Sequence, residues 1–433
     1  MSRINLHRMA VVMLATLTCI CIATQTVCAQ TFSVIYSFPG GSLGARPYAG
    51  VTIDRAGNLY GTTLAGGRAS CNPDGIAGCG TVYKLTQKNS QWVFGQLYSF
   101  AGGTDGAVPY LSRVVVGPNG SLYGATIAGG GGECQEEFGV PGCGTVFNLQ
   151  PPQSACTAVS CPWHETQLYV FQGSANGGHD GASPVADPIF DQSGNIYGVT
   201  FGGGSEISGT AYELSPSNGG WTENILWSFS PTQATPAGTM VFDSAGNLYG
   251  TSYGDPATGA VWELTHSGSG WSEDTLYTFQ NGSDGEYPYA GVIFDQAGNL
   301  YGSTTNGGSG GGGTVFQLSP SNGGWQFNLL NSLAGTLNDQ CGPEGDLVMD
   351  GAGNLYGTTT CGGQFHRGSV FELSPSNGSW MYTSLHDFRN GDDGGYPVSN
   401  LVFDASGNLY GTALSGGTGN CTAGCGVVFK ITP

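Results

Sequence analysis

The feature that most constrains this sequence is a motif that occurs seven times. Residues 51–63 read Val-Thr-Ile-Asp-Arg-Ala-Gly-Asn-Leu-Tyr-Gly-Thr-Thr, and the tyrosine of this motif returns at intervals of 52 to 74 residues. Repeats of this kind are typical of β-propellers, whose blades commonly span about 40 to 50 residues plus loop insertions. The tyrosines of the seven copies are Tyr60, Tyr123, Tyr197, Tyr249, Tyr301, Tyr356 and Tyr410.

Each copy divides into four short runs of apolar, β-branched or aromatic residues. In the fifth copy these runs cover residues 292–295, 299–304, 313–318 and 325–333. Such runs, separated by Gly, Asn, Ser and Pro, are typical of β-strands. We therefore predict an all-β fold, a single seven-bladed β-propeller over residues 30–433. The predicted four-stranded blades cover residues 47–100, 109–171, 184–229, 236–279, 288–333, 343–388, and 397–433 together with 31–38.

The seventh copy has only three such runs, and its missing fourth run occurs near the N-terminus. Residues 31–38 read Thr-Phe-Ser-Val-Ile-Tyr-Ser-Phe and match the end of the first copy, Leu-Tyr-Ser-Phe at residues 97–100. An unpaired strand edge promotes aggregation, and closure of the ring removes it. We predict that the N-terminal strand completes the last blade.

The first 29 residues have the pattern of a secretory signal peptide. Arg3 and Arg8 are followed by an apolar run over residues 9–22 and by Val-Cys-Ala at residues 27–29, a small-residue cleavage pattern. The apolar run is short for a bilayer span, which takes about 20 residues. We predict a monomer that is secreted, periplasmic or at the cell surface and does not insert into a membrane after signal cleavage.

The mature chain is strongly acidic. Loss of Arg3 and Arg8 leaves nine basic and 30 acidic residues, a net charge near −21. Nucleic acids are bound through a basic surface that neutralises their phosphates. Nine dispersed Lys and Arg residues do not supply such a surface, so we predict no nucleic-acid partner.

Ten cysteines follow the signal segment, and they occur as close pairs. In an exported chain such pairs are typical of disulfide bonds. Zinc ligation is the alternative, but the nearby histidines do not complete a tetrahedral ligand set at a familiar spacing, so we predict no metal there. The predicted disulfides join Cys71 to Cys79, Cys134 to Cys143, Cys156 to Cys161, Cys341 to Cys361 and Cys421 to Cys425.

The repeat also resembles a known family. The pattern Asp-x-x-Gly-Asn-Leu-Tyr-Gly-Thr-Thr, then Gly-Gly, then Gly-Thr-Val-Phe-x-Leu, is similar to the GloVer (Gloeo_Verruco-type) tandem repeat of bacterial surface proteins, and the similarity covers residues 31–433. This resemblance implies an exported propeller and brings no assigned activity or catalytic residue. A weaker similarity, through Asp-x-x-Gly-Asn-Leu-Tyr, links the chain to NHL-type propellers.

The two faces of such a propeller differ in sequence. Loops that join strands 1–2 and 3–4 lie on one face, where the 1–2 turn is nearly always Asp-x-x-Gly-Asn. We interpret these aspartates as turn residues that accept backbone N–H bonds. The 2–3 and 4–1 loops on the other face vary in length and carry four of the cysteine pairs. Because variable loops on a rigid scaffold are the usual place of binding, we expect a ligand there.

Candidate ligand-binding residues are those that depart from the repeat on the variable face. The first group lies at the expected channel mouth, close after the proline that begins strand 1, where an arginine, two aspartates and an asparagine could bind a polar ligand. A solvated channel lining is the alternative interpretation. The first group is Arg113, Asp187, Asp346 and Asn400, and the nearby loops add His179, Glu286, His366 and Arg367.

A second acidic series occurs in the 4–1 loops. Each member is followed by Gly and, shortly after, by Pro, which favours a role in turn capping. Calcium is the alternative, because clustered oxygen ligands suit it, but no complete twelve-residue EF-hand pattern is present. We expect no other cofactor. The series is Asp105, Asp180, Asp284 and Asp393.

Two functions remain open at this point. The first is a non-enzymatic binding or interaction module outside the cytoplasm, with a polysaccharide or a surface protein as its partner. The second is a lyase or a glycoside hydrolase that uses residues of the channel mouth. Catalysis requires a positioned acid and base, and no recognisable pair stands out in the sequence, so the catalytic residues are unknown and the first function is favoured.

Overall fold

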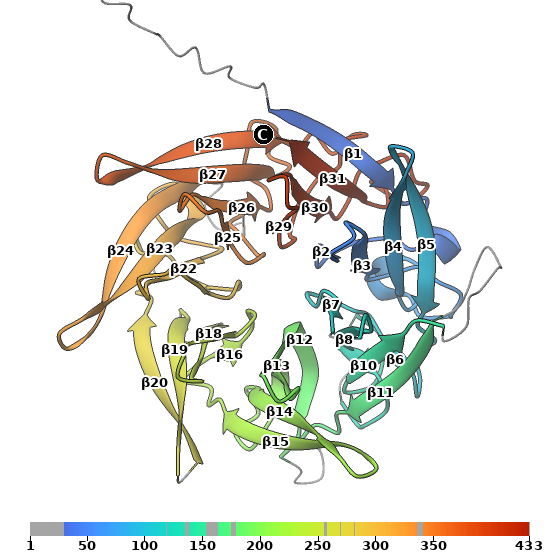
Figure 1. The fold of residues 1–433 in the computed structure, drawn as a ribbon, viewed down its shortest axis with the longest axis horizontal. Coiled ribbons are helices and arrows are strands. Elements are labelled where there is room, and N and C mark those ends of the chain that lie inside the picture. The colour runs from blue at the N-terminus through green and yellow to red at the C-terminus, as the bar shows by residue number, and fades with distance from the viewer. Residues whose placement is uncertain are drawn as a thin grey trace, which may run out of the picture.

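Seven small antiparallel sheets form a closed ring in the computed structural model of the protein (Figure 1). The structure describes residues 30–117, 119–134, 138–152, 163–174, 179–254, 258–268, 270–280, 282–335 and 341–432. Apart from two 3-10 turns, η1 (Gly41–Leu43) and η2 (Pro73–Gly75), these residues form strands and loops. The predicted seven-bladed β-propeller is confirmed.

In each blade the first strand lies nearest the centre of the ring and the fourth strand lies at its rim (Figure 1). Blade 1 consists of β2 (Val51–Ile53), β3 (Leu59–Thr63), β4 (Thr81–Lys88) and β5 (Gln91–Ser99). Blade 2 consists of β7 (Val115–Val116), β8 (Leu122–Thr126), β10 (Thr145–Gln150) and β11 (His164–Val170). Blade 3 consists of β12 (Gly181–Phe190), β13 (Ile196–Gly203), β14 (Thr210–Ser217) and β15 (Gly220–Ser228).

The second half of the ring repeats this plan. Blade 4 consists of β17 (Val241–Phe242), β18 (Leu248–Tyr253), β19 (Ala260–Ser267) and β20 (Gly270–Thr278), with β16 (Thr235–Pro236) also paired to β18. Blade 5 consists of β21 (Ile293–Phe294), β22 (Leu300–Ser303), β23 (Gly311–Ser321) and β24 (Gly324–Ala334). Blade 6 consists of β25 (Val348–Met349), β26 (Leu355–Thr359), β27 (Ser369–Ser376) and β28 (Ser379–Asp387). A separate short pair joins β6 (Gly106–Ala107) to β9 (Ala128–Gly129).

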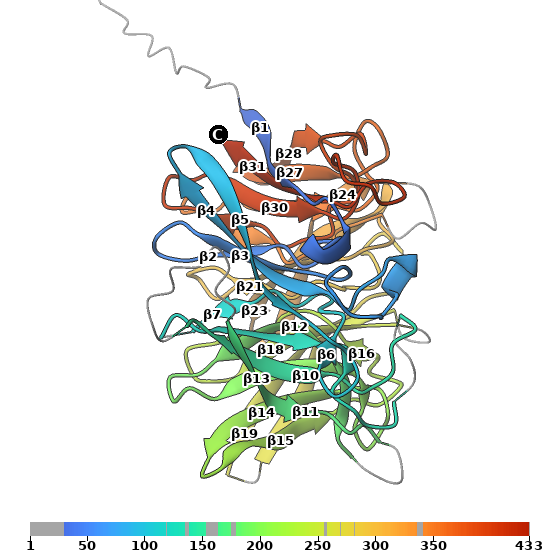
Figure 2. The ribbon, with the colours of Figure 1, turned by 90° about the vertical axis from the view of Figure 1, so that its right-hand side faces the viewer.

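Blade 7 is closed by the N-terminal strand, as predicted. It consists of β29 (Val402–Phe403), β30 (Leu409–Ala413), β31 (Val427–Thr432) and β1 (Thr31–Ser37). Strands β1 and β31 are antiparallel, with Thr31 opposite Thr432 and Ser37 opposite Val427, and they lie side by side in both views (Figures 1 and 2). The register shifts between Val34 and Tyr36, as it does between the third and fourth strands of the other blades.

The repeated aspartate is a turn residue, as its sequence context suggested. Asp54 Oδ1 accepts the backbone N–H groups of Ala56 and Asn58, each at 2.9 Å, and its Oδ2 accepts the Tyr60 hydroxyl at 3.0 Å. Burial by itself would raise the pKa of Asp54, but these hydrogen bonds outweigh burial and lower it. The same contacts recur at Asp191, Asp243, Asp295, Asp350 and Asp404.

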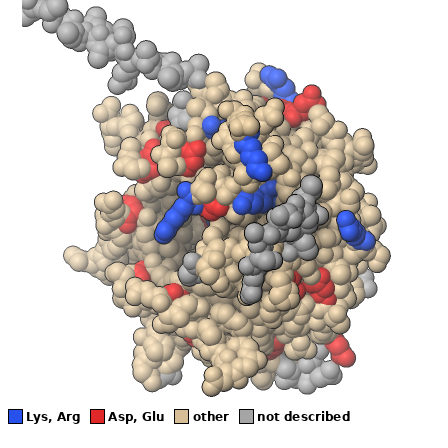
Figure 3. All heavy atoms as spheres, turned by 45° about the vertical axis from the view of Figure 1, so that its right-hand side comes forward, with Lys and Arg blue, Asp and Glu red and all other residues tan. Residues whose placement is uncertain are grey.

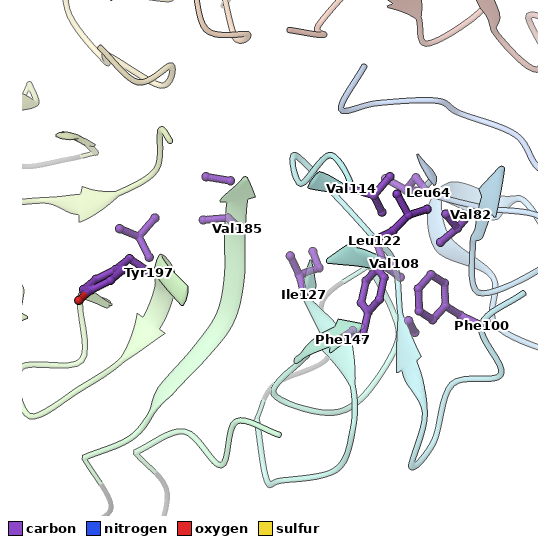
Figure 4. Packing of buried hydrophobic residues seen from close by; sticks show 14 of the residues in the cluster. Leu64, Val82, Phe100, Val108, Val114, Leu122, Ile127, Phe147, Val185 and Tyr197 are labelled. Atoms are coloured by element: carbon purple, nitrogen blue, oxygen red, sulfur yellow. The ribbon is translucent and has the colours of Figure 1, made fainter. Parts of the chain in front are cut away.

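The hydrophobic core lies between neighbouring blades. Phe100, at the end of blade 1, is buried against Phe147 of blade 2 with their ring centroids 5.2 Å apart (Figure 4). The glycine of each Leu-Tyr-Gly motif leaves room for an aromatic ring of the third strand. A Cβ atom on Gly61 would lie 2.4 Å from the Tyr83 hydroxyl oxygen, which explains why this position is Gly beside so large a residue.

The rims of neighbouring blades meet where their fourth strands contact each other, and we call each such contact a seam. Every blade but blade 5 has an aromatic or histidine residue at one position of its fourth strand, two residues before the end of the run. At three seams this ring stacks on a phenylalanine of the following blade. These pairs are Tyr36 on Phe94 with centroids 4.6 Å apart, Tyr277 on Phe327 at 4.4 Å and His386 on Phe32 at 3.6 Å.

At three other seams a glutamate takes the place of that phenylalanine, namely Glu165, Glu223 and Glu273. The hydroxyl of Tyr169 lies 3.1 Å from Glu223 Oε2 and 3.3 Å from Asp180 Oδ2, so it can donate to one of two neighbouring carboxyls. Burial, followed by the charge of Asp180, raises the pKa of Glu223. At the preceding seam, burial and then the charge of Asp105 raise the pKa of Glu165 to about 7.

Four disulfide bonds cross-link loops of the variable face in the described residues. They join Cys71 to Cys79, Cys134 to Cys143, Cys341 to Cys361 and Cys421 to Cys425, as predicted. The bond between Cys341 and Cys361 links a 4–1 loop to a 2–3 loop, which places these two loops on one face. The predicted pair Cys156 and Cys161 lies outside the described residues.

Within the described residues, no helix has the length and apolar character needed to cross a bilayer.

The pairing of β1 with β31 predicts that the N-terminal strand is essential for stability. Deletion of residues 30–38 should expose the edge of β31, and the variant should aggregate or melt at a clearly lower temperature than the mature protein. Size-exclusion chromatography and thermal unfolding measure the two effects, with the chain that begins at Gln30 as the control. A truncated protein that stays monomeric and melts like the control would contradict closure by this strand.

The glutamates at the seams predict a loss of stability as the pH rises towards neutrality. The folded protein holds the proton of Glu165 up to about pH 7, whereas an unfolded chain releases it near the ordinary pKa of about 4.3. The stabilising contribution is therefore complete below about pH 4 and is lost as the pH rises to about 7. The free energy of unfolding, measured with urea, should fall less over this range in Glu165→Gln/Glu223→Gln than in the wild type. The two proteins should have similar free energies of unfolding near pH 4. An identical decline would show that these carboxyls do not titrate in this way.

Candidate functional site

The structure brings together the four residues predicted at the channel mouth, which we call the inner ring: Arg113, Asp187, Asp346 and Asn400. Arg113 donates from Nε and Nη2 to Asp187 Oδ2 at 2.7 Å and 2.6 Å. Asn400 Nδ2 donates to Asp346 Oδ2 at 3.1 Å and lies 3.4 Å from Asp187 Oδ2. The four side chains, contributed by blades 2, 3, 6 and 7, therefore meet at the centre of the propeller.

The inner ring also links successive blades through their backbones. The N–H of Arg113 donates to Asp187 Oδ1, that of Gly291 to Asp346 Oδ1 and that of Asp346 to Asn400 Oδ1, each at 2.6 Å. The first strand of each blade is the inner edge of its sheet, where N–H groups lack a partner strand. Side chains of the next blade thus supply the missing acceptors, and most of the polar atoms of the inner ring already have partners within the protein.

Burial and charge set the ionisation of the inner ring. The Arg113 side chain is 20% exposed and that of Asp187 is 7% exposed. Burial opposes the charge of the Arg113 guanidinium, but the neighbouring Asp187 outweighs it and raises the pKa of Arg113. Burial, together with the charge of Asp187, raises the pKa of Asp346. The ion pair of Arg113 and Asp187 is therefore the charged centre of the ring.

A second layer lies closer to the variable face, because its residues directly follow the prolines that begin the first strands. The Tyr48 hydroxyl donates to Glu344 Oε2 at 2.7 Å, and the Tyr110 hydroxyl donates to the Tyr48 oxygen at 3.2 Å. The Tyr289 hydroxyl is hydrogen-bonded to Tyr110, and the Thr360 hydroxyl donates to Glu344 Oε1 at 3.1 Å. Three tyrosines of blades 1, 2 and 5 thus converge on one carboxyl of blade 6.

Further aromatic rings complete this layer. Tyr253 lies 4.6 Å from Tyr289 between ring centroids and 5.8 Å from Phe201, and both Phe201 and Tyr253 lie in the C-terminal half of the second strand of their blades. All of these side chains are half-buried. Burial raises the pKa of Glu344, and its hydrogen bonds offset only part of this effect. We call this layer the aromatic mouth, consisting of Tyr48, Tyr110, Phe201, Tyr253, Tyr289 and Glu344.

The space between the two layers is small. A cavity of about 10 Å³ is lined by Tyr289 and Glu344 of the aromatic mouth and by Asp346 and Asn400 of the inner ring. A cavity of this size holds about one water molecule. The space between Tyr289, Glu344, Asp346 and Asn400 therefore does not hold a larger ligand.

The other predicted binding residues lie on the loops. His179, His366 and Arg367 are exposed, Glu286 is half-buried, and none of the four lines the cavity between the layers. His366 adopts a positive φ of 54°, and the Arg367 guanidinium donates to the Tyr396 hydroxyl. The roles of these residues and of the inner ring in ligand binding stay predictions.

The acidic series of the 4–1 loops caps turns in the described residues. Asp105 Oδ2 accepts the N–H of Ala101 at 2.8 Å and the Tyr98 hydroxyl at 3.0 Å. Asp284 Oδ2 accepts the corresponding groups of Gln280 and Tyr277, each at 2.9 Å. In the part of the chain that the structure describes, no three His, Cys, Asp or Glu side chains are grouped as metal ligands. Calcium binding stays a prediction.

Comparison with known proteins places the chain in a family. The profile of the Gloeobacter/Verrucomicrobia repeat matches residues 21–255 and 254–433. The chain belongs to this repeat family. The resemblance inferred from the sequence motif is therefore confirmed, and membership of a propeller repeat family indicates a binding or interaction module. No curated protein matches the chain.

Three solved structures similar to this Gloeobacter/Verrucomicrobia repeat protein share between 11% and 15% identity with it. A proposed 6-phosphogluconolactonase of Bacteroides uniformis is 15% identical over 77% of this chain and 84% of its own, with a TM-score of 0.47. A proposed oxidoreductase (glucose dehydrogenase) of Thermus thermophilus is 13% identical over 93% and 100%, with a TM-score of 0.41. A protein of unknown function from Dyadobacter fermentans is 11% identical over 94% and 99%, with a TM-score of 0.45.

The aromatic mouth of the repeat protein was missed in the sequence, although a signal was present. The proline that begins strand 1 is followed by tyrosine at residues 48, 110 and 289 and by glutamate at residue 344. Blades 3, 4 and 7 have the smaller residues Val185, Ala237 and Val398 at this position. Side chains at the same position of each repeat meet near the axis of the ring. The residues that follow these prolines could therefore have indicated the site from the sequence alone.

The ion pair of the inner ring predicts that Asp187 contributes more to stability than a turn aspartate does. Asp187→Ala leaves the Arg113 charge and its N–H without their partner, so the free energy of unfolding should fall by about 3 kcal/mol. Asp295→Ala, the matched control, removes the turn hydrogen bonds that this carboxylate accepts but leaves no opposite charge unpaired, and it should cost about 1 kcal/mol. Urea unfolding of both variants measures the difference. An equal fall in the free energy of unfolding in both variants would show that the ion pair stabilises the protein no more than the turn hydrogen bonds of one aspartate do.

Proposed function

We propose that this repeat protein is an exported binding module that takes up a terminal sugar of a polysaccharide at its aromatic mouth. The observation that carries the proposal is the convergence of five aromatic rings and the Glu344 carboxyl at the centre of the variable face. Ligand sites are commonly lined by aromatic side chains with a few convergent polar groups.

The chemistry of the mouth favours a sugar. A tyrosine presents both an apolar ring and a polar hydroxyl, and a pyranose likewise combines apolar C–H faces with hydroxyl groups. Tyr48, Tyr110 and Tyr289 can each stack with or hydrogen-bond to such a ligand, and Glu344 supplies a carboxyl in reach of the same space.

The charge of the protein narrows the choice of polysaccharide. The mature chain has a net charge near −21, and the few Lys and Arg side chains that Figure 3 shows lie mostly in the upper half of that face. A sulfated or phosphorylated polymer would be repelled by such a chain. A neutral or amino-sugar polymer is therefore the favoured partner, and a surface protein is the alternative outcome of the test.

Export is supported by the covalent structure. Disulfide bonds form and persist mainly in oxidising compartments, and the described residues contain four of them. The predicted signal segment, residues 1–29, lies outside the described residues. A secreted, periplasmic or cell-surface location fits both features.

The alternative of a lyase or a glycoside hydrolase receives less support. Glycoside hydrolysis commonly uses two carboxyl groups that flank a bound sugar. Glu344 and Asp346 line one cavity, but that cavity has a volume of only about 10 Å³, and the two oxygens of Asp346 accept hydrogen bonds from Gly291 and Asn400.

The test is binding of the mature protein to an array of neutral and amino-sugar oligosaccharides, followed by calorimetry on the ligands found. Tyr289→Ala and Glu344→Gln should each weaken binding at least tenfold. Ile207→Ala is the control, because it removes an exposed apolar side chain from a loop of the same face and should bind like the wild type. Unchanged binding in both mouth variants, or capture of a protein partner without any glycan, would contradict the proposal.

A further inference from the structure

One seam of the propeller differs from the other six. In six blades, the residue six positions after the one that opens the fourth strand run (Trp in blades 1 to 6) has an aromatic or imidazole ring. Blade 5 has Asn331 at this position. The residues of the other blades are Tyr98, Tyr169, Trp227, Tyr277, His386 and Tyr36.

Across the seam between blades 5 and 6, the residue opposite Asn331 is Tyr382 of blade 6. One face of the Tyr382 ring lies over Phe371, with centroids 5.8 Å apart and an interplanar angle of 24°. Phe327 of blade 5 is held over Phe316 in the same way, at 5.8 Å and 24°, but Tyr277 of the preceding blade covers its second face at 4.4 Å. Asn331 cannot provide such a ring. Tyr382 is accordingly 39% exposed.

The missing ring is associated with a pocket. A cavity of about 510 Å³ lies between β24 and β28 and is lined by Asn331, Ser332, His366, Tyr382, Ser384 and Asp387, among others. Its volume falls in the range of about 300 to 1,000 Å³ that is common for small-ligand sites. Asp387 is itself a departure from the repeat, because Ser228 and Thr278 hold the equivalent position in blades 3 and 4.

The lining combines one open aromatic face with several polar groups. The Ser384 hydroxyl donates to Asp387 Oδ1 at 2.8 Å, and both groups border the same cavity as the Asn331 amide and the exposed His366 ring. An apolar ring ligand would leave these polar groups without partners, which costs free energy. A pyranose ring satisfies both requirements, since its C–H face can stack on Tyr382 and its hydroxyls can pair with the amide and the carboxylate.

We propose that the seam between blades 5 and 6 is a second binding site, separate from the aromatic mouth, which holds one pyranose ring of a glycan. The sugar stacks on Tyr382 in the place that Tyr277 takes on Phe327, and Asn331 and Asp387 bind its hydroxyls. The site lies at the rim of the propeller, so it accommodates an internal unit of a chain as well as a terminal one.

The decisive variant is Asn331→Tyr, which restores the ring that the other seams contain. It should fill the cavity, raise the melting temperature or leave it unchanged, and weaken pyranoside binding at this site at least tenfold. Tyr382→Ser removes the stacking face without filling the cavity and should weaken binding to a similar extent. Met381→Ala is the control, because Met381 is 57% exposed and its side chain alternates to the opposite face of β28.

The measurement is saturation-transfer NMR with a panel of methyl glycosides of glucose, galactose, mannose, fucose and N-acetylglucosamine. The seam variants are compared in the Tyr289→Ala background, so that the mouth does not contribute to the signal. Tyr289→Ala alone and together with Met381→Ala should show binding that is lost when Asn331→Tyr or Tyr382→Ser is added. Binding that survives in the folded Tyr289→Ala/Tyr382→Ser variant, or no binding by Tyr289→Ala, would overturn this site. Loss in Tyr289→Ala alone would leave the mouth as the sugar site and refute the seam, so the two proposals fail separately.

Discussion

The architecture depends on hydrogen-bond partners for the backbone N–H and C=O groups at the edges of each sheet. Each four-stranded blade has an inner and an outer edge, and a ring of blades is complete only when every sheet is complete. Blade 7 obtains its fourth strand from the opposite end of the chain, since β1 pairs with β31 from Thr31 to Ser37. This pairing joins the two ends of the described chain without a covalent bond and removes the edge that β31 would otherwise expose.

The inner edges are satisfied in a different way. The first strands surround the channel and have no further strand to pair with, so side chains of the following blade accept their N–H groups. The residues that depart from the repeat at this position therefore perform a structural task as well as any binding task. The close approach of blades 1 and 7 at Gly50 and Asn400 shows the other solution, in which absence of a side chain lets two backbones pair directly.

Residues that depart from the repeat form different groups of side chains at the variable face, further along the channel and at the rim. Next to the variable face, large phenol rings and one carboxyl converge on the axis, while two residues deeper the charged pair of Arg113 and Asp187 closes the ring. At the rim, a cavity lies beside Asn331, where the other blades have a ring. The scaffold supplies the positions, and the exceptions to its repeat supply the candidate sites.

The sequence alone determined the fold, because a sevenfold motif with four strand runs and turn-forming Asp-x-x-Gly-Asn permits few other arrangements. It also predicted closure by the N-terminal strand and the four disulfides that the structure describes, since all of these follow from repeat register and short spacing. The sequence placed Arg113, Asp187, Asp346 and Asn400 at the centre, but only the tertiary structure decided that they bond mainly to one another. The aromatic mouth and the pocket beside Tyr382 likewise depend on which side chains of distant blades meet across the axis or a seam, and that is set by packing between blades rather than by the pattern within any one of them.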